Sequence, residues 1–232
     1  SGDLAELREL ARWFRETGGT WVGWTGNTRA NPRAFERDGL LLQPVAIRAR
    51  EIDQYYDGMA NRTLWPLYHD AISTPEFRRE WWKPYCEINA RFARAISRAA
   101  RPNDAVWVHD YHLQMVPALL RAMRPDLRIG FFLHIPFPPD ELFEWLPWRD
   151  AILNGLLGAD LIGFQTAHAV HNFSRVARKY TAAKGREGRL LVSGRKVEVG
   201  SFPISIDFDW WNAQASSPSV QSRAAELRKR VG

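Results

Sequence analysis

The chain has 232 residues, of which 45% are hydrophobic and 25% are charged, a balance typical of a globular protein. The formal net charge is +6, and the 27 arginines and 5 lysines are scattered, so no basic run supports a nucleic-acid surface. The single Cys86 excludes an internal disulfide framework. With no secretory signal and no apolar run of about 18 residues, we expect a cytoplasmic protein with no membrane partner.

The amino-terminal third of the chain predicts short elements separated by glycine and proline. Apolar residues recur at helical spacing from Leu4 to Phe14, and Gly18-Gly19 stops that helix. We expect a helix over 4–16, a strand over 20–24, a loop over 27–39, a strand over 40–47 and a helix over 52–62. Pro66 should end or kink the last of these helices.

A long helical pattern then occupies residues 74–101. Thr74 is a plausible N-cap, because Pro75 would take the first helical position. Pro84 lies inside the pattern and should kink or divide the helix.

Three short apolar runs follow, and each breaks off at polar residues. We expect strands over 105–109, 128–133 and 160–164, helices over 113–123, 140–145, 147–157 and 167–180, a hairpin over 190–192 and 196–201, and a polar helix over 219–230. Short apolar strands that alternate with helices are typical of a parallel sheet covered by helices. The sequence therefore predicts an α/β fold with a Rossmann-like, mostly parallel sheet flanked by helices.

The ends of two predicted strands carry candidate functional residues. His109-Asp110 ends one strand and His134 follows the next. Ligands bind beyond the carboxyl ends of parallel strands, so we expect Asp110 and His134 to converge on one hollow. A carboxylate there can accept hydrogen bonds from sugar hydroxyls, and an imidazole can donate to a hydroxyl or a phosphate. Two plainer interpretations stay open: Asp110 caps the next helix, and His134 is a satisfied core residue.

The stretch HDYH also resembles a pair of metal ligands, His109 and His112. No further cluster of His, Cys or carboxylate residues completes such a site, so we expect no metal. The sequence has no P-loop, no GxGxxG and no serine nucleophile elbow, which disfavours dinucleotide-binding and hydrolase functions. We therefore expect no cofactor.

A second group of candidates is aromatic. Tyr55-Tyr56 and Trp65 lie nine or ten residues apart around Asn61. The tyrosine hydroxyl and the indole N–H are donors, and donors suit phosphate oxygens. Aromatic packing is the alternative explanation for these residues.

Four stretches together resemble the amino-terminal half of the trehalose-6-phosphate synthase family: WVGW, YYDGMANRTLWPLYHD, VWVHDYHLQMVPALLR and IGFFLHIPFPPDELFEWLPWRDAILNGLLGADLIGFQT. The resemblance implies the N-terminal domain of a GT-B glycosyltransferase. Such an enzyme joins glucose from a nucleotide-glucose to glucose 6-phosphate with retention of configuration. It further implies an acceptor-binding domain over residues 1–207 and a tail over 208–232 that leads toward a nucleotide-sugar domain outside this sequence.

The resemblance also implies roles for individual residues. Tyr56 and Trp65 match residues that bind the acceptor phosphate, and Trp24 matches an aromatic residue beside the acceptor pocket. Asp110 matches a carboxylate that hydrogen-bonds the acceptor glucose near the reaction centre, and His134 matches a histidine that contacts the donor glucose. The family needs no metal.

The chain departs from the family pattern at its first residues. Gly2 matches the first glycine of a pair beside the donor phosphates, but Asp3 takes the place of the second glycine. A carboxylate there fits an anionic donor poorly. Because the residues that bind the nucleotide are outside the sequence, we expect these 232 residues alone to be inactive.

Three other functions stay open. The chain could belong to a sister glycosyltransferase that uses another phosphorylated acceptor, such as glycerol 3-phosphate. It could also be a non-catalytic sugar-phosphate-binding paralogue, and a nucleic-acid binder is the least supported function. The sequence leaves the donor base and homo-oligomer formation open.

Overall fold

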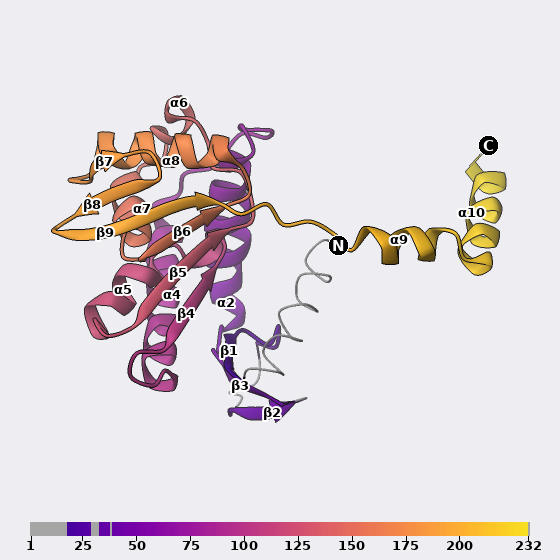
Figure 1. The fold of residues 1–232 in the computed structure, drawn as a ribbon, viewed down its shortest axis with the longest axis horizontal. Helices are drawn as coiled ribbons and strands as arrows, with labels where there is room; N and C mark the ends of the chain where they lie inside the picture. The colour runs from indigo at the N-terminus through magenta and orange to yellow at the C-terminus, as the bar shows by residue number, and fades with distance from the viewer. Residues whose placement is uncertain (1–17, 29–32, 38, 232) are drawn as a thin grey trace. The chain divides into compact units, whose positions relative to one another are not determined.

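The computed structural model describes residues 18–28, 33–37 and 39–231. The helix expected over 4–16 and the candidate Gly2 lie outside these residues. The chain divides into two compact units, and one of them is formed by Thr20–Pro203. This unit contains two sheets and most of the helices (Figure 1).

The main sheet has six strands in the order β4-β5-β6-β9-β8-β7. These are β4 (Ala105–His109), β5 (Arg128–Leu133), β6 (Leu161–Phe164), β9 (Arg195–Ser201), β8 (Arg189–Val192) and β7 (Lys184–Arg186). The first four strands in this order are parallel, and β8 is antiparallel to both of its neighbours. The predicted α/β fold with a mostly parallel sheet is confirmed.

One face of the main sheet forms the core. Alternate strand side chains point to the same face, and the buried set comes from four strands: Val108, Ile129, Phe131, Leu133, Ile162, Phe164, Val197 and Val199. Helices α4 (Arg79–Ala99), α5 (Val116–Met123), α7 (Arg149–Leu156) and α8 (Ala167–Tyr180) pack against one another, and α5 and α8 contact the sheet. The short helix α6 (Asp140–Phe143) precedes α7.

The smaller sheet consists of β1 (Thr20–Gly23), β3 (Leu40–Pro44) and β2 (Phe35–Arg37), with β3 in the centre. Strand β1 runs parallel to β3, and β2 runs antiparallel to it. The two strands predicted from apolar runs are confirmed, although β3 ends earlier than expected. The loop predicted over 27–39 is wrong at β2, because three exposed residues offer no apolar pattern to read.

A continuous helical segment runs from residue 49 to residue 68. It consists of α2 (Ala49–Ile52), the π-helix η1 (Asp53–Leu64) and α3 (Trp65–Tyr68). We expected Pro66 to end or kink the helix, but the helix does not end there and continues to Tyr68. Pro66 has no backbone N–H to donate to the preceding turn, and the carbonyl of Arg62, four residues back, accepts from the backbone N–H of Glu76 at 2.9 Å.

Helix α4 begins at Arg79, so the predicted N-cap at Thr74 is wrong. The residues before it are extended, because the backbone N–H of Glu76 donates to the carbonyl of Arg62 at 2.9 Å. The hydroxyl of Thr63 donates to the carbonyl of Glu76, which ties this segment to η1. Pro84 lies within α4 without dividing it.

Residues 204–231 belong to the second unit. They contain α9 (Phe208–Ala215) and α10 (Pro218–Val231). The predicted helix over 219–230 is confirmed, whereas α9 was not predicted. In the part of the chain that the structure describes, no helix is long and apolar enough to cross a membrane.

Candidate functional site

Asp110 and His134 lie next to each other at the carboxyl ends of two adjacent parallel strands. Strands β4 and β5 pair in register, with His109 opposite Phe132. The backbone N–H of Asp110 donates to the carbonyl of Phe132 at 2.7 Å, which extends the ladder by one residue. The backbone N–H of His134 donates to Asp110 Oδ1 at 3.3 Å. The predicted proximity of Asp110 and His134 is therefore present in the fold.

The capping interpretation does not fit Asp110, whereas His134 has a hydrogen-bond partner in His109. Asp110 precedes the short 3₁₀ helix η2 (Tyr111–Leu113), but its side chain makes no capping hydrogen bond there. His134 is only partly buried. Both residues lie at the carboxyl ends of their strands, where ligands bind in parallel sheets.

Asp110 has an unusual backbone conformation, with φ 71° and ψ 169°. This region is essentially reserved for glycine, and another residue there costs on the order of 1–3 kcal/mol. Such conformations cluster at functional sites, where the surrounding structure fixes a side chain in a required position. The conformation at Asp110 is what turns the chain from β4 into η2.

Two further histidines flank this pair. The Nδ1 of His109 lies 2.9 Å from the Nε2 of His134, and the Nδ1 of His112 lies 3.9 Å from Asp110 Oδ2. Burial lowers the pKa of His109 to about 4, with a smaller contribution from His134, and burial lowers the pKa of His112 to about 4. Both imidazoles are therefore neutral near pH 7. Among the described residues no three His, Cys, Asp or Glu side chains are grouped to hold a metal ion.

The π-helix η1 determines how Tyr56 and Trp65 are presented. Nine positions span about 2.5 turns of an α-helix, which would place the two side chains on opposite sides. The i→i+5 bonding of a π-helix gives about 4.4 residues per turn, so nine positions complete roughly two turns. Here the backbone N–H of Trp65 bonds the carbonyl of Ala60, five residues back. Tyr56 and Trp65 therefore share one face of the helix, with exposed fractions of 38% and 37%.

A chain of ring contacts joins this helix face to the strand ends. The rings of Trp24 and Tyr56 have centroids 6.3 Å apart, and Tyr56 stacks on His112 at 5.2 Å with planes inclined by 15°. The His112 ring then approaches the Asp110 carboxylate. The structure thus brings Trp24, Tyr56, Asp110 and His134 into one region, and Trp65 lies on the same helix face as Tyr56.

Two buried nitrogens in this region lack partners among the described residues. They are the indole Nε1 of Trp24 and the Nε2 of His112. The rings of both residues contact the ring of Tyr56. A buried polar atom without a hydrogen bond costs on the order of 1–3 kcal/mol, so a ligand or a water that reached these atoms would be stabilised. Sequence reasoning considered His112 only as a metal ligand and missed its stacking on Tyr56.

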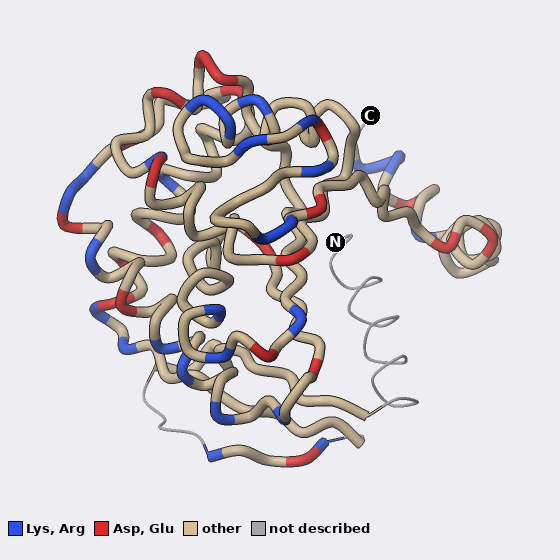
Figure 2. The backbone as a smooth tube through the Cα atoms, turned by 60° about the vertical axis from the view of Figure 1, so that its left-hand side comes forward, with Lys and Arg blue, Asp and Glu red and all other residues tan. Residues whose placement is uncertain are grey.

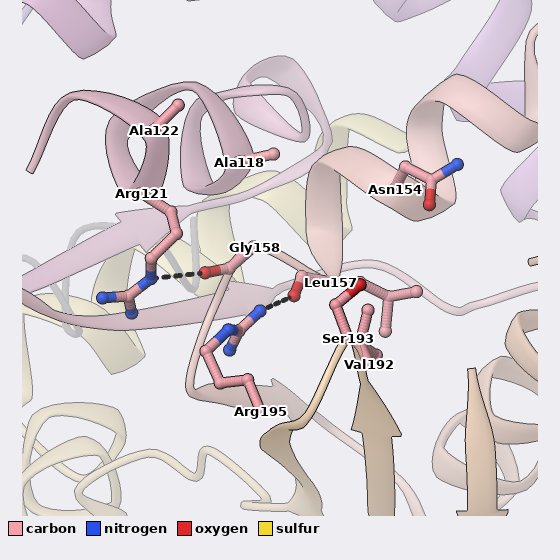
Figure 3. A pocket seen from close by; sticks show the side chains of 9 residues that line it. All are labelled: Ala118, Arg121, Ala122, Asn154, Leu157, Gly158, Val192, Ser193 and Arg195. Atoms are coloured by element: carbon pink, nitrogen blue, oxygen red, sulfur yellow. Dashed lines mark hydrogen bonds between the residues drawn. The ribbon is translucent and has the colours of Figure 1, made fainter. Parts of the chain in front are cut away.

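A separate hollow lies at the opposite ends of the strands (Figure 3). It is bordered by α5, the end of α7 and the β8–β9 turn. Arg121 donates to the carbonyl of Gly158 at 3.4 Å and forms an ion pair with Asp160 at 2.5 Å. Arg195 donates to the carbonyls of Leu157 and Ala159. Because these guanidinium groups bind backbone carbonyls and Asp160, we assign them to joining the strand ends.

Basic and acidic positions are interspersed along the backbone (Figure 2). Several of them form exposed ion pairs, such as Arg189 with Glu198 at 3.4 Å. Exposed pairs of this kind contribute little to stability, at most about 1 kcal/mol each.

The comparison with known families decides the classification. The sequence profile of Glycosyltransferase family 20 matches residues 2–232. The chain belongs to this family.

The family 20 chain is similar in sequence to trehalose-6-phosphate synthases. It is 48% identical over 228 residues to the trehalose-6-phosphate synthase of Mycobacterium sp. (strain KMS), covering 94% of this chain and 47% of that protein. It is 46% identical to the trehalose-6-phosphate synthase of Mycobacterium ulcerans (strain Agy99), covering all of this chain and 48% of that protein. The chain therefore spans about half the length of these relatives, and the predicted resemblance to trehalose-6-phosphate synthases is confirmed.

Solved structures give the same result for the fold. The family 20 chain matches the UDP-forming trehalose-phosphate synthase of Burkholderia xenovorans with a TM-score of 0.84 and 31% identity, covering 94% of this chain and 50% of that one. It matches the same organism's synthase in complex with glucose-6-phosphate with a TM-score of 0.80 and 31% identity, covering 94% and 52%.

Proposed function

We propose that this chain is the acceptor-binding half of a glucosyltransferase that joins glucose from a nucleotide-glucose to glucose 6-phosphate, giving trehalose 6-phosphate. The observation that carries the proposal is the convergence of Asp110 and His134 with the aromatic face of η1. Membership of family 20 and the relatives' names support this reaction over others. We assign residues 1–207 to the acceptor-binding domain and 208–232 to the tail.

The acceptor lies between two kinds of contact in this proposal. The hydroxyl of Tyr56 and the indole N–H of Trp65 donate to the phosphate, since both are exposed on one helix face. The Asp110 carboxylate accepts hydrogen bonds from the sugar hydroxyls, and Trp24 closes the side of the pocket next to Tyr56. A phosphate at one end and a hydroxylated ring at the other match glucose 6-phosphate better than glycerol 3-phosphate, which is shorter.

The transfer itself needs no enzymic nucleophile in this proposal. The acceptor hydroxyl attacks the anomeric carbon of the donor on the face from which the phosphate departs, which retains the configuration. The bond to the departing phosphate breaks as the new bond forms, and a phosphate oxygen takes the hydroxyl proton. The protein contributes orientation and electrostatic stabilisation. Asp110 therefore orients the acceptor, and His134, together with Gly2 outside the described residues, contacts the donor.

Calorimetric titration tests the acceptor assignment directly. We expect the chain to bind glucose 6-phosphate more tightly than glucose or glycerol 3-phosphate, because only the first offers both a phosphate and a ring. Replacing Tyr56→Phe or Trp65→Phe removes one donor to a charged group and should weaken binding of glucose 6-phosphate by about tenfold or more, on the order of 1.5–3 kcal/mol.

Trp210→Phe is the matched control, because Trp210 is 44% exposed and belongs to α9, outside the unit that contains η1. It should leave the affinity unchanged. Equal affinity for glucose 6-phosphate in the Tyr56 and Trp65 variants would refute the phosphate assignment. A preference for glycerol 3-phosphate would favour the sister glycosyltransferase.

A further inference from the structure

His109 and His134 project from the same face of the main sheet. His109 pairs with Phe132 across the two strands, and His134 lies two residues beyond Phe132, so their side chains share a face. The ring of Trp107 lies 4.5 Å from that of His109, and the ring of Phe132 lies 4.8 Å from that of His134. Both imidazoles are thus held by a neighbouring aromatic side chain of their own strand.

The two rings meet through one pair of nitrogens. His109 Nδ1 and His134 Nε2 are 2.9 Å apart, and the ring planes are inclined by only 20°. The centroids are 5.2 Å apart, which is close to this distance plus the distance of each nitrogen from its ring centre. The nitrogens therefore point at each other in nearly one plane, the geometry of a strong N–H···N hydrogen bond.

This contact can contain only one hydrogen. A neutral imidazole carries a proton on one nitrogen and a lone pair on the other, so one ring must donate and the other accept. An isolated neutral histidine side chain prefers its proton on Nε2. Both rings keep that preference in only one arrangement, in which His134 Nε2–H donates to the lone pair of His109 Nδ1.

We propose that His109 is a positioning residue, which fixes the ring plane and the tautomer of His134 through this hydrogen bond. In the fixed tautomer the Nδ1 of His134 is an acceptor. His134 then selects a sugar hydroxyl, which can donate a hydrogen bond, over a phosphate oxygen, which cannot. This last step rests on the proposed function, whereas the tautomer itself does not.

Nitrogen-15 NMR of the histidine rings in the 232-residue chain tests the proposal without any ligand. The resonances of His134 are assigned by their loss in His134→Gln. We expect wild-type His134 at pH 7 to show a protonated Nε2 and an unprotonated Nδ1. A protonated Nδ1, or two nitrogens averaged between tautomers, would overturn the proposal.

Two variants separate the hydrogen bond from ring packing. His109→Phe keeps an aromatic ring between Trp107 and His134 but removes the acceptor, so the two His134 nitrogens should shift toward averaged values. His109→Asn places an amide oxygen near the position of Nδ1, so it should retain the protonated Nε2 although the ring is lost. An unshifted His134 spectrum in His109→Phe would contradict the proposal.

The proposed function is tested separately by adding glucose 6-phosphate to the wild-type chain. A fixed His134 tautomer without binding of glucose 6-phosphate would refute the proposed function and leave the histidine pair standing. Binding together with an averaged tautomer would refute the role of His109 alone.

Discussion

Asp110 combines backbone strain with a carboxylate that does no structural capping. Its φ of 71° and ψ of 169° would suit glycine, yet the chain has aspartate there. Its Oδ1 accepts a hydrogen bond from the backbone N–H of His134 at 3.3 Å, and its Oδ2 lies 3.9 Å from His112 Nδ1. Because strained conformations cluster at functional sites, we infer that this carboxylate is kept for a ligand at the expense of stability.

This inference predicts an unusual order of stability at position 110. Asp110→Gly should be more stable than Asp110→Ala by about 1–2 kcal/mol, because alanine keeps the strain and glycine relieves it. Both variants should lose binding of glucose 6-phosphate. Urea denaturation gives the free energies of unfolding, and calorimetry gives the binding.

Asp57, exposed within η1, provides the control. There the usual helical order should hold, with Asp57→Ala more stable than Asp57→Gly by about 1 kcal/mol. If alanine were as stable as glycine at position 110, the backbone there would be unstrained. If Asp110→Gly still bound glucose 6-phosphate normally, the carboxylate would have no part in acceptor binding.

The two buried histidines predict a pH dependence of stability. Burial lowers the pKa of His109 and of His112 to about 4 in the folded chain, against about 6.5 when unfolded. Between these values the unfolded chain binds more protons, so stability is full above pH 6.5 and falls as the pH drops toward 4. The loss should be on the order of 3 kcal/mol per histidine.

Urea midpoints measured at intervals from pH 7 to pH 4 check this expectation. His112→Phe keeps a ring against Tyr56 and removes the titrating group, so its stability should fall less over the same range. Glu51 and Asp140 have lowered pKa values, so their contributions disappear only at lower pH. An equal slope in wild type and variant would contradict the assignment to His112.

The sequence predicts the placement of Asp110 and His134 well, because both follow strands. Asp110 and His134 follow apolar runs that become β4 and β5 with the expected bounds, so their approach follows from the rule for parallel sheets. The contact between His109 and His134, the stacking of His112 on Tyr56 and the strained backbone were not predicted. They depend on side-chain directions and dihedral angles that no short pattern encodes.

The helical segment from residue 49 to residue 68 also has a feature that the sequence pattern does not encode. Its helical character was predicted over 52–62, but its π geometry was not. With ordinary α-helical periodicity Tyr56 and Trp65 would face opposite ways. Their shared face therefore comes from tertiary constraints on η1, among which are the bonds that tie Thr63 and Arg62 to Glu76.

Gly58 is a second constraint on η1, because it allows α4 to approach closely. A Cβ added at Gly58 would lie 2.6 Å from the ring of Trp81. Gly58→Ala should therefore destabilise the fold by about 1–3 kcal/mol through overpacking, although alanine normally stabilises a helix by about 1 kcal/mol. Urea denaturation measures the difference.

The exposed Asp57→Ala variant serves again as the control for Gly58→Ala. It lies one residue away on η1 and should change the free energy of unfolding by no more than about 0.5 kcal/mol. A Gly58→Ala chain as stable as wild type would show that η1 and α4 can separate without cost. The shared face of Tyr56 and Trp65 would then need another explanation.

Other elements were missed for identifiable reasons. Strand β7 has the sequence KGR and is exposed throughout, and α9 has the sequence FDWWNAQA with no buried residue. Neither shows the alternation of buried and exposed residues on which sequence reading depends. The helix predicted over 74–101 begins only at Arg79. The backbone hydrogen bond from Glu76 to Arg62 holds the residues before it outside the helix.

Among the described residues, the candidate site lies at the carboxyl ends of the parallel strands and a separate hollow lies at their amino ends. The first region combines a carboxylate, neutral imidazoles and exposed aromatic donors, while the arginines of the second are bonded within the fold. The expectation that these 232 residues do not transfer glucose alone stays a prediction. The chain spans about half of its relatives' length, so only acceptor binding can be tested on it directly.

The most direct test is a crystal structure of the chain with glucose 6-phosphate. We predict that the phosphate lies within hydrogen-bonding distance of the Tyr56 hydroxyl and the Trp65 indole N–H, with the sugar hydroxyls at the Asp110 carboxylate. Glucose 6-phosphate bound instead in the hollow beside Arg121 and Arg195, or elsewhere away from Asp110, would contradict the account.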